Sequence, residues 1–129
     1  MIQKDYIVRM IEKIISLLVE ALLQKRKLEN NEIDEYKDVT KQILGMTPSD
    51  LVNYSPESII DKYSCLPESA GRIELAALIM NMISNELDEG NILQKARLEQ
   101  NGVGLLKYLQ QNSGTFSFQR EEIINKIIK

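Results

Sequence analysis

The sequence predicts an all-α protein in which antiparallel helical hairpins pack into a short array or bundle. Between Tyr6 and Leu22 the polar residues fall within about 100° of a helical wheel, and the apolar residues cover about 220°. Helical spacing recurs along the chain, and strand-like alternation occurs only in the short stretch Thr115–Phe118. We therefore expect helix over about 70–80 % of the chain, well above the usual third.

The first helix is expected from about Lys4 to Lys27. Asp5 lies in its first turn and basic residues lie in its last, as the helix dipole favours. Its apolar arc is wider than one packing partner requires, so neighbours should cover it on two or three sides. Ile14 and Leu18 lie near the centre of this arc, and we expect both to be buried.

A chain of 129 residues fits one domain, so we expect the second half of the chain to cover the first helix, helped by Ile59 and Ile60. The predicted domain spans residues 1–129. It consists of a hairpin over residues 4–44, a connector over 45–68, a hairpin over 69–111 and a terminal helix over 117–129.

The second helix is expected from about Glu32 to Leu44, with a narrow apolar stripe, and Gly45 is expected to end it as a C-cap. The intervening turn, about residues 28–31, is short. Short connections make neighbouring helices antiparallel, so these two helices should form the first hairpin.

The connector contains all three prolines of the chain. Thr47 and Ser55 each precede a proline, which is typical of an N-cap residue followed by proline at the first helical position. Two short helices are therefore predicted, over Pro48–Asn53 and Pro56–Tyr63.

The next hairpin starts with a helix predicted over Ile73–Leu87 and ended by Gly90. Its broad apolar face is expected to be buried, and its polar residues are expected on the outer face: Glu74, Asn81, Ser84, Asn85 and Asp88.

The second helix of this hairpin, about Asn91–Gln110, has two apolar stripes, so it should pack against neighbours on both sides: Ile92, Ala96, Val103 and Leu106 form one, and Leu98, Leu105 and Leu109 form the other. Gly102 and Gly104 in its interior indicate either close helix approach or a local bend.

Ser117 is expected to cap the last helix, which should dock through apolar residues: Phe118, Ile123, Ile124, Ile127 and Ile128.

The second hairpin is similar to a tetratricopeptide-like helical repeat. Ala96 and Val103 match the two small-residue positions of the second repeat helix, and Gly90 matches the turn. The whole chain also resembles a family of small bacterial helical proteins of uncharacterised function, through Met1–Ile7, Ile43-Leu44-Gly45 and the Ile73–Gly90 hairpin. That resemblance implies a repeat-like helical fold, and it implies no catalytic residues because the family has no established activity.

Charge and composition narrow the possible functions. The net charge of −3 argues against a nucleic-acid surface, which usually requires a concentrated basic patch. No stretch of 18 uncharged apolar residues occurs, so we expect no membrane span. Cys65 is the only cysteine and no signal peptide is recognisable, which favours a reducing, cytoplasmic location. The chain has no histidine, which removes histidine-dependent catalysis and the usual zinc and iron ligand sets.

Several residue groups are candidates for binding, and each also has a structural interpretation. The cluster Lys25-Arg26-Lys27 suits a phosphate or an acidic partner, but the preferred interpretation is a helix C-terminus favoured by the dipole. Met80 and Met82 suit an adaptable groove, but their helical spacing favours core packing. The acidic residues around Gly90 lack the spacing of a calcium loop. The remaining candidates have mainly structural interpretations: Cys65, Glu121, Glu122, Tyr36, Tyr54, Tyr63 and Tyr108.

We therefore expect no catalytic, cofactor-binding or metal-binding residues. The leading hypothesis is a non-catalytic interaction module that binds a protein or peptide partner, as helical-repeat scaffolds do. One alternative is a small-ligand-binding protein or enzyme that uses carboxylate and tyrosine groups in a pocket between the hairpins. Another is a structural subunit of a larger assembly. A homodimer through exposed apolar residues of the terminal helices is also expected.

Overall fold

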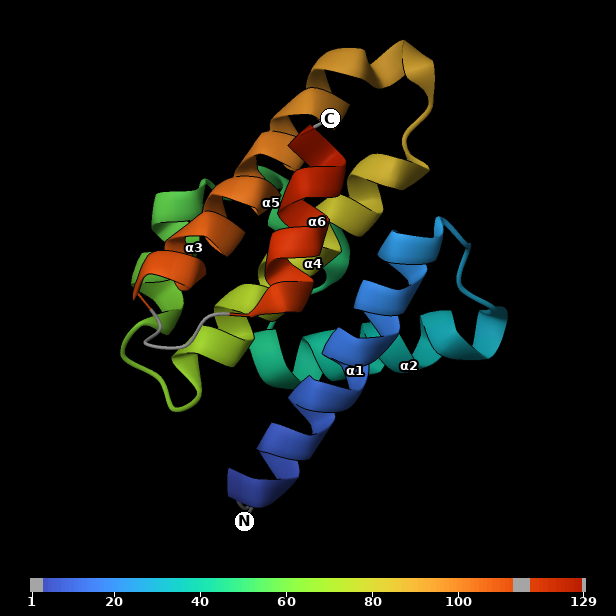
Figure 1. Cartoon of the computed structure of the whole chain (residues 1–129). Helices are drawn as coiled ribbons and strands as arrows, with labels where there is room; N and C mark the ends of the chain where they lie inside the picture. The colour runs from blue at the N-terminus through green and yellow to red at the C-terminus, as the bar shows by residue number, and fades with distance from the viewer. Residues whose placement is uncertain (1–3, 113–116, 129) are drawn as a thin grey trace.

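The computed structural model describes residues 4–112 and 117–128, of which 85 % are helical. No strand occurs among these residues, so the all-α prediction is confirmed; Thr115 lies outside the described residues, and Phe118 begins a helix. The elements in order are α1 (Lys4–Gln24), α2 (Asn30–Leu44), the 3₁₀ helix η1 (Pro48–Asn53), α3 (Pro56–Tyr63), α4 (Ser69–Glu86), the 3₁₀ turn η2 (Glu89–Asn91), α5 (Ile92–Asn112) and α6 (Phe118–Ile128) (Figure 1).

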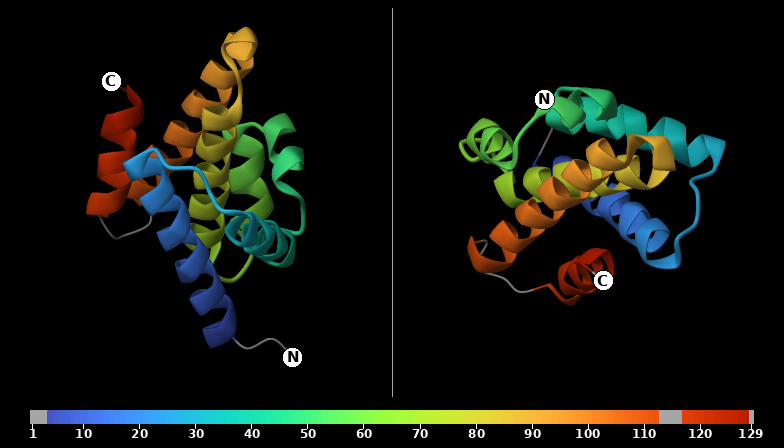
Figure 2. Two further views of the ribbon diagram at one scale, coloured as in Figure 1. Left: turned by 90° about the vertical axis from the view of Figure 1, so that its right-hand side faces the viewer. Right: turned by 90° about the horizontal axis from the view of Figure 1, so that it is seen from above.

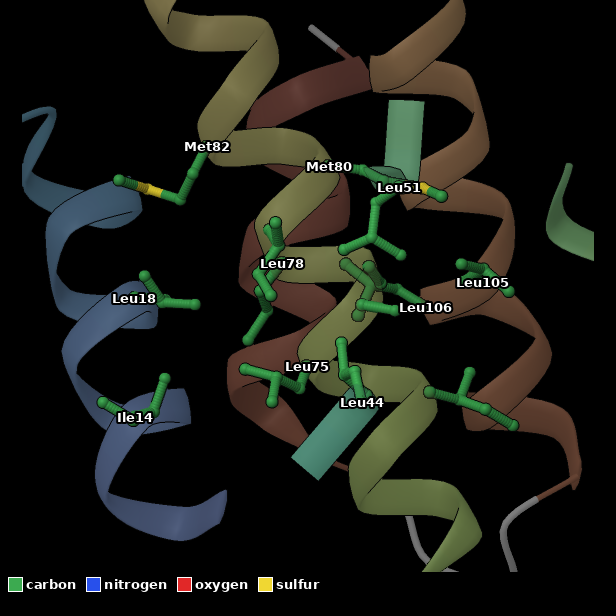
Figure 3. Close-up of a cluster of buried hydrophobic side chains, with 14 of the residues drawn as sticks. Ile14, Leu18, Leu44, Leu51, Leu75, Leu78, Met80, Met82, Leu105 and Leu106 are labelled. Carbon is green, nitrogen blue, oxygen red and sulfur yellow. The ribbon is translucent and has the colours of Figure 1, made fainter. Parts of the chain in front are cut away.

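Helix α4 lies at the centre of the structure (Figure 2). Every residue from Leu75 to Met82 is buried, and the neighbours of α4 are α1, α2, η1, α3 and α5. Figure 3 shows Leu75 and Leu78 among the side chains that meet α1. Because α4 is covered all round, its buried side chains unite the apolar residues of the other helices into one cluster.

The predicted outer face of α4 is partly wrong. Asn85 and Asp88 are exposed as expected, but Asn81 and Ser84 are each only 1 % exposed. Glu74 is also largely covered, with 16 % of its side chain exposed. The reason is that Gly102 of α5 lies against Asn81 and Arg120 of α6 lies against Glu74, so a polar stripe that a lone amphipathic helix would turn to water is enclosed.

Helix α1 is covered from within the chain, as predicted. Its main partner is α4, and α2 and α6 add further contacts. Ile14 and Leu18 are fully buried. The helix ends at Gln24, three residues before the predicted end, because Lys25 adopts the left-handed conformation (φ 55) and the Arg26 N–H donates to the Ala21 carbonyl at 3.1 Å. This bond from the second residue after the cap is the Schellman pattern.

Helix α2 packs against α1, and its narrow stripe is shared among α1, α4 and η1. It crosses α1 in Figure 1 and runs in the opposite direction to α1 in the right-hand view of Figure 2, so the predicted first hairpin stays a prediction. Gly45 ends α2 in the left-handed conformation (φ 74), as predicted. The last carbonyls of α2 accept hydrogen bonds from elsewhere: Tyr63 donates to Leu44 at 2.6 Å, and Arg72 donates to Ile43.

Both short helices of the connector have the predicted bounds. The backbone N–H of Thr47 donates to the Asp50 carboxylate at 3.0 Å, and the Ser58 N–H donates to the Ser55 hydroxyl at 3.1 Å. The main partners of α3 are α4 and α5. The cover expected from Ile59 and Ile60 for α1 therefore goes to these two helices instead.

Helices α4 and α5 form the predicted second hairpin (Figure 1). Helix α4 already ends at Glu86, so Gly90 does not terminate it but lies in η2. The stripes predicted for α5 hold only for its later turns, because Ile92 is 67 % exposed and Ala96 is also exposed. The close approach expected at a glycine occurs at Gly102, where a Cβ would lie 2.5 Å from Oδ1 of Asn81. A tetratricopeptide-like array stays a prediction.

Helix α6 docks through Ile123 and Ile124, which are buried, and Ile127 is partly buried. Ser117 caps it as predicted, since its hydroxyl accepts from the Arg120 N–H at 3.2 Å. Phe118, expected to be part of the docking surface, is 79 % exposed. The side chain of Ile128 lies outside the described residues.

Substitution of Leu18 tests the packing of α1. Leu18→Ala should cost about 2–5 kcal/mol in unfolding free energy, because it opens a cavity in a fully buried site. Glu12→Ala, on the exposed strip, should change stability by no more than about 0.5 kcal/mol. Urea unfolding measures both, and equal midpoints would show that α1 faces the core differently.

Two glycines of α5 offer a matched test of the helix approach. Gly102→Ala should destabilise by about 1–3 kcal/mol, because its Cβ would meet Asn81 at 2.5 Å and the Ala77 carbonyl oxygen at 2.9 Å. Gly104→Ala should stabilise by up to about 1 kcal/mol, since its Cβ would enter open space within a helix. Changes of the same sign in the two unfolding free energies would contradict the close contact of α4 with α5.

Candidate functional site

A groove of about 760 Å³ opens near the C-terminal ends of α1 and α4. We call it the basic groove. Its lining comes from α1, the turn after it, α2, α4, α5 and α6: Ala21, Leu22, Lys25, Arg26, Lys27, Leu28, Ile33, Met82, Asn85, Glu86, Glu99, Ile123, Lys126 and Ile127. Its volume lies within the range of binding clefts, and it collects segments that are far apart in the sequence.

The floor of the basic groove is apolar. Leu22 of α1, Met82 of α4 and Ile123 of α6 are buried there, and Ile33 and Ile127 are partly exposed. Each methionine therefore fits a different one of the two interpretations. Met80 is fully buried in the core, whereas Met82 lines the groove. A flexible thioether at this position gives the floor an adaptable surface.

The turn at one rim of the groove is fixed by Arg26. Its guanidinium bonds to Glu32 at 3.0 Å and to Glu20 at 3.1 Å, and it also donates to the Lys27 carbonyl. The hydrogen bonds to Glu32 and Glu20 raise the pKa of Arg26 above its usual range. The Glu32 carboxylate accepts hydrogen bonds from Arg26 and from the Glu29 N–H, and these bonds lower its pKa. Arg26 therefore serves the structure, since its charge is already matched.

Lys25 and Lys27 flank Arg26 and are exposed. Neither forms an ion pair with any residue that the structure describes. Lys126 of α6 also lines the groove, but its ammonium group donates to the Leu23 carbonyl at the end of α1, where helix carbonyls lack partners. The rim thus presents two ammonium groups without local partners over an apolar floor.

The α4–α5 wall of the groove carries Asn85, Glu86 and Glu99. Within the described part of the chain, neither of the two carboxylates forms an ion pair. The charges around the groove are therefore separated by element, with the positive groups on the turn and α6 and the negative groups on α4 and α5.

A second, smaller cavity of about 370 Å³ lies among α1, α4 and α6, and its polar lining includes Glu12, Glu68 and Glu74. Glu74 forms an ion pair with Arg120 at 2.9 Å. Burial raises the pKa of the Glu74 carboxyl, and the charge and hydrogen bond of Arg120 act against this shift. Arg120 also donates to the amide oxygen of Gln110 at 2.8 Å, so this cluster fastens α6 to α4 and α5.

The other candidates do not gather into a site. Among the acidic residues near Gly90, Glu86 lines the basic groove, whereas the Asp88 carboxylate accepts from Asn91 within η2 at 2.9 Å. No group of acidic residues or cysteine suited to a metal ion occurs among the described residues. Cys65 is exposed, and Glu121 accepts from Gln110 at 3.2 Å.

The tyrosines contribute to neither of the two cavities. Burial raises the pKa of Tyr63 to about 12, and its hydroxyl is engaged by the Leu44 carbonyl. Burial, together with the charge of Glu86, also raises the pKa of Tyr36. The combination of carboxylate and tyrosine in one pocket, which the ligand-binding alternative expected, is therefore not found in these cavities.

Comparison with protein-family models, curated proteins and solved structures finds no match for this chain. Within the described residues, no helix combines the length and apolar character that a membrane span requires. Sequence reasoning identified the Lys25–Lys27 cluster, but it missed the groove. Only the tertiary fold brings Leu22, Met82 and Ile123 together beside it.

Substitution of Arg120 tests the interior ion pair. Arg120→Met should cost about 3–5 kcal/mol at pH 7, because it leaves the Glu74 carboxylate largely buried and unpaired. Burial raises the pKa of Glu74 in the folded state above its value in the unfolded chain. The carboxyl therefore costs the fold nothing at a pH below the unfolded-state pKa, where it is protonated in both states, and it destabilises the fold as the pH rises. The cost should therefore shrink as the pH falls towards about 4, near the ordinary glutamate pKa.

The control for this substitution is Lys13→Met, which breaks the exposed ion pair with Glu35. It should change stability little, and independently of pH. Chemical unfolding at several pH values measures both variants. A cost for Arg120→Met that stays constant between pH 4 and 7 would contradict the role given to Glu74.

Proposed function

We propose that this chain is a non-catalytic helical interaction module that binds a protein or peptide partner in the basic groove. The observation that carries the proposal is the groove itself, which has a volume of about 760 Å³, an apolar floor and a charged rim. Apolar clefts with a few well-placed polar groups are the usual form of binding sites.

A helical partner segment suits this surface best. The described residues include no strand, so they offer no sheet edge to which a peptide strand can add. The groove offers a surface of side chains. Such a surface binds an amphipathic helix through the apolar residues of that helix at positions i, i+3 or i+4, and i+7. A tetratricopeptide-like mode of binding and a cytoplasmic location are part of the same proposal, the latter because Cys65 is the chain's only cysteine.

The alternative is a small-ligand-binding protein or an enzyme that uses carboxylates. Glu74, with its raised pKa in the smaller cavity, is the observation that favours it. Its ion pair with Arg120 gives Glu74 a structural role instead, so we prefer the interaction module. A homodimer would rest on Tyr6 and Phe118, which are exposed on the two terminal helices.

Selection from a displayed library of helical peptides tests the proposal. Peptides of about 16 residues are suitable, because shorter isolated helices are marginal. We expect enriched peptides that shift the methyl resonances of Met82 and Ile123 in the groove. Asn85→Trp should obstruct the groove and weaken binding by about tenfold or more.

The matched control is Asn53→Trp, an exposed position outside the groove lining. It should leave the affinity unchanged. Failure to enrich any peptide, or binding that Asn85→Trp does not weaken, would contradict the proposed function.

A further inference from the structure

We infer that the partner of the basic groove is an amphipathic helical segment whose acidic residues contact Lys25 and Lys27. This inference rests on the proposed function and adds the chemistry and the orientation of the partner. It follows from three features: the size of the groove, the ammonium groups at its rim, and the separation of charge between its walls.

The size of the groove matches a short length of helix. A helix is about 10 Å across and rises about 5.4 Å per turn, so about 760 Å³ corresponds to roughly two turns. Two turns present three apolar side chains on one face, at positions i, i+3 or i+4, and i+7. Ile33 and Ile127, the partly exposed residues of the floor, together with the edge of Met82, are the surface that would receive them.

The rim determines the sign of the partner's charge. Arg26 is matched by Glu20 and Glu32, and Lys126 is engaged by the Leu23 carbonyl. Lys25 and Lys27 have no ion-pair partner among the described residues. Carboxylates of a bound segment would supply such partners at the edge of an apolar surface, where charge complementarity fixes register and orientation.

The backbone at Lys25 supports this assignment. Lys25 occupies the left-handed position after α1, which glycine ordinarily fills, as Gly45 does after α2. A side chain is disfavoured in that conformation. The Schellman bond and the Arg26 hydrogen bonds hold the turn in place, so the two ammonium groups are attached to a well-defined backbone.

The other wall determines the orientation. Glu86 and Glu99 would repel an acidic residue and would accept hydrogen bonds from lysine, arginine or amide groups. The bound segment should therefore carry its acidic residues at the end over Lys25 and Lys27, and basic or amide residues at the end over the α4–α5 wall.

Two peptide libraries with the same apolar stripe test the inference. In one library the remaining positions are Glu or Gln, and in the other they are Lys or Gln. The full chain should enrich the acidic library, with glutamates concentrated at one end. Replacing those glutamates by glutamine in the best peptide should weaken binding by about three- to thirtyfold, as expected for two rim ion pairs.

Charge reversal supplies the control. Lys25→Glu combined with Lys27→Glu should abolish the preference for the acidic peptide and should favour the lysine version of that peptide. Lys37→Glu combined with Lys107→Glu makes the same change in net charge at exposed positions outside the groove lining. This control should leave the preference intact, and circular dichroism should show the same helix content in all the variants.

The outcomes separate this inference from the proposed function. Equal binding of acidic and lysine peptides in the groove would overturn the inference and leave the interaction module standing. Absence of binding from both libraries would overturn both. Binding of dodecanoate in the groove, without any peptide binding, would also overturn both and favour the small-ligand alternative.

Discussion

The structure depends on the enclosure of α4, and above all on its close contact with α5. Gly102 lets the two helices approach until Asn81 lies directly over the α5 backbone. Asn81 is 1 % exposed, and neither polar atom of its amide has a hydrogen-bond partner among the described residues. Burial of an amide without a partner is costly, so the apolar packing along α4 must offset it. The seven buried apolar residues between Leu75 and Met82 supply that packing.

The basic groove is a consequence of the same arrangement. Helices α1 and α5 both pack on α4, and α6 contacts both α1 and α5. The C-terminal end of α1 lies beside that of α4, where α4 is less enclosed and Asn85 and Glu86 reach solvent (Figure 2). The floor formed there is apolar because Leu22 and Met82 continue the core outward. The groove is thus the open end of the packing around α4.

The success of sequence reasoning followed the range of the interactions involved. The bounds of η1 and α3, and the caps at Thr47 and Ser55, depend on residues within three positions, and the sequence predicted them correctly. The C-cap at Gly45 is equally local. The faces of α4 depend on which helix covers each side, and a wheel diagram contains no such information. Asn81 was therefore placed on the wrong side, and the groove could not be predicted, because distant parts of the chain build it.

The helix dipole favours basic residues at the C-terminal end of α1, but it does not require that their ammonium groups line a groove. Arg26 contributes to the fold through Glu20 and Glu32, but the ammonium groups of Lys25 and Lys27 contribute no described contact. At Lys25 stability alone would favour glycine, because the left-handed conformation disfavours a side chain. Residues held in such conformations concentrate at functional sites, where another requirement offsets the cost. Recognition of a negatively charged partner is a requirement that a glycine at position 25 would not meet and a lysine does.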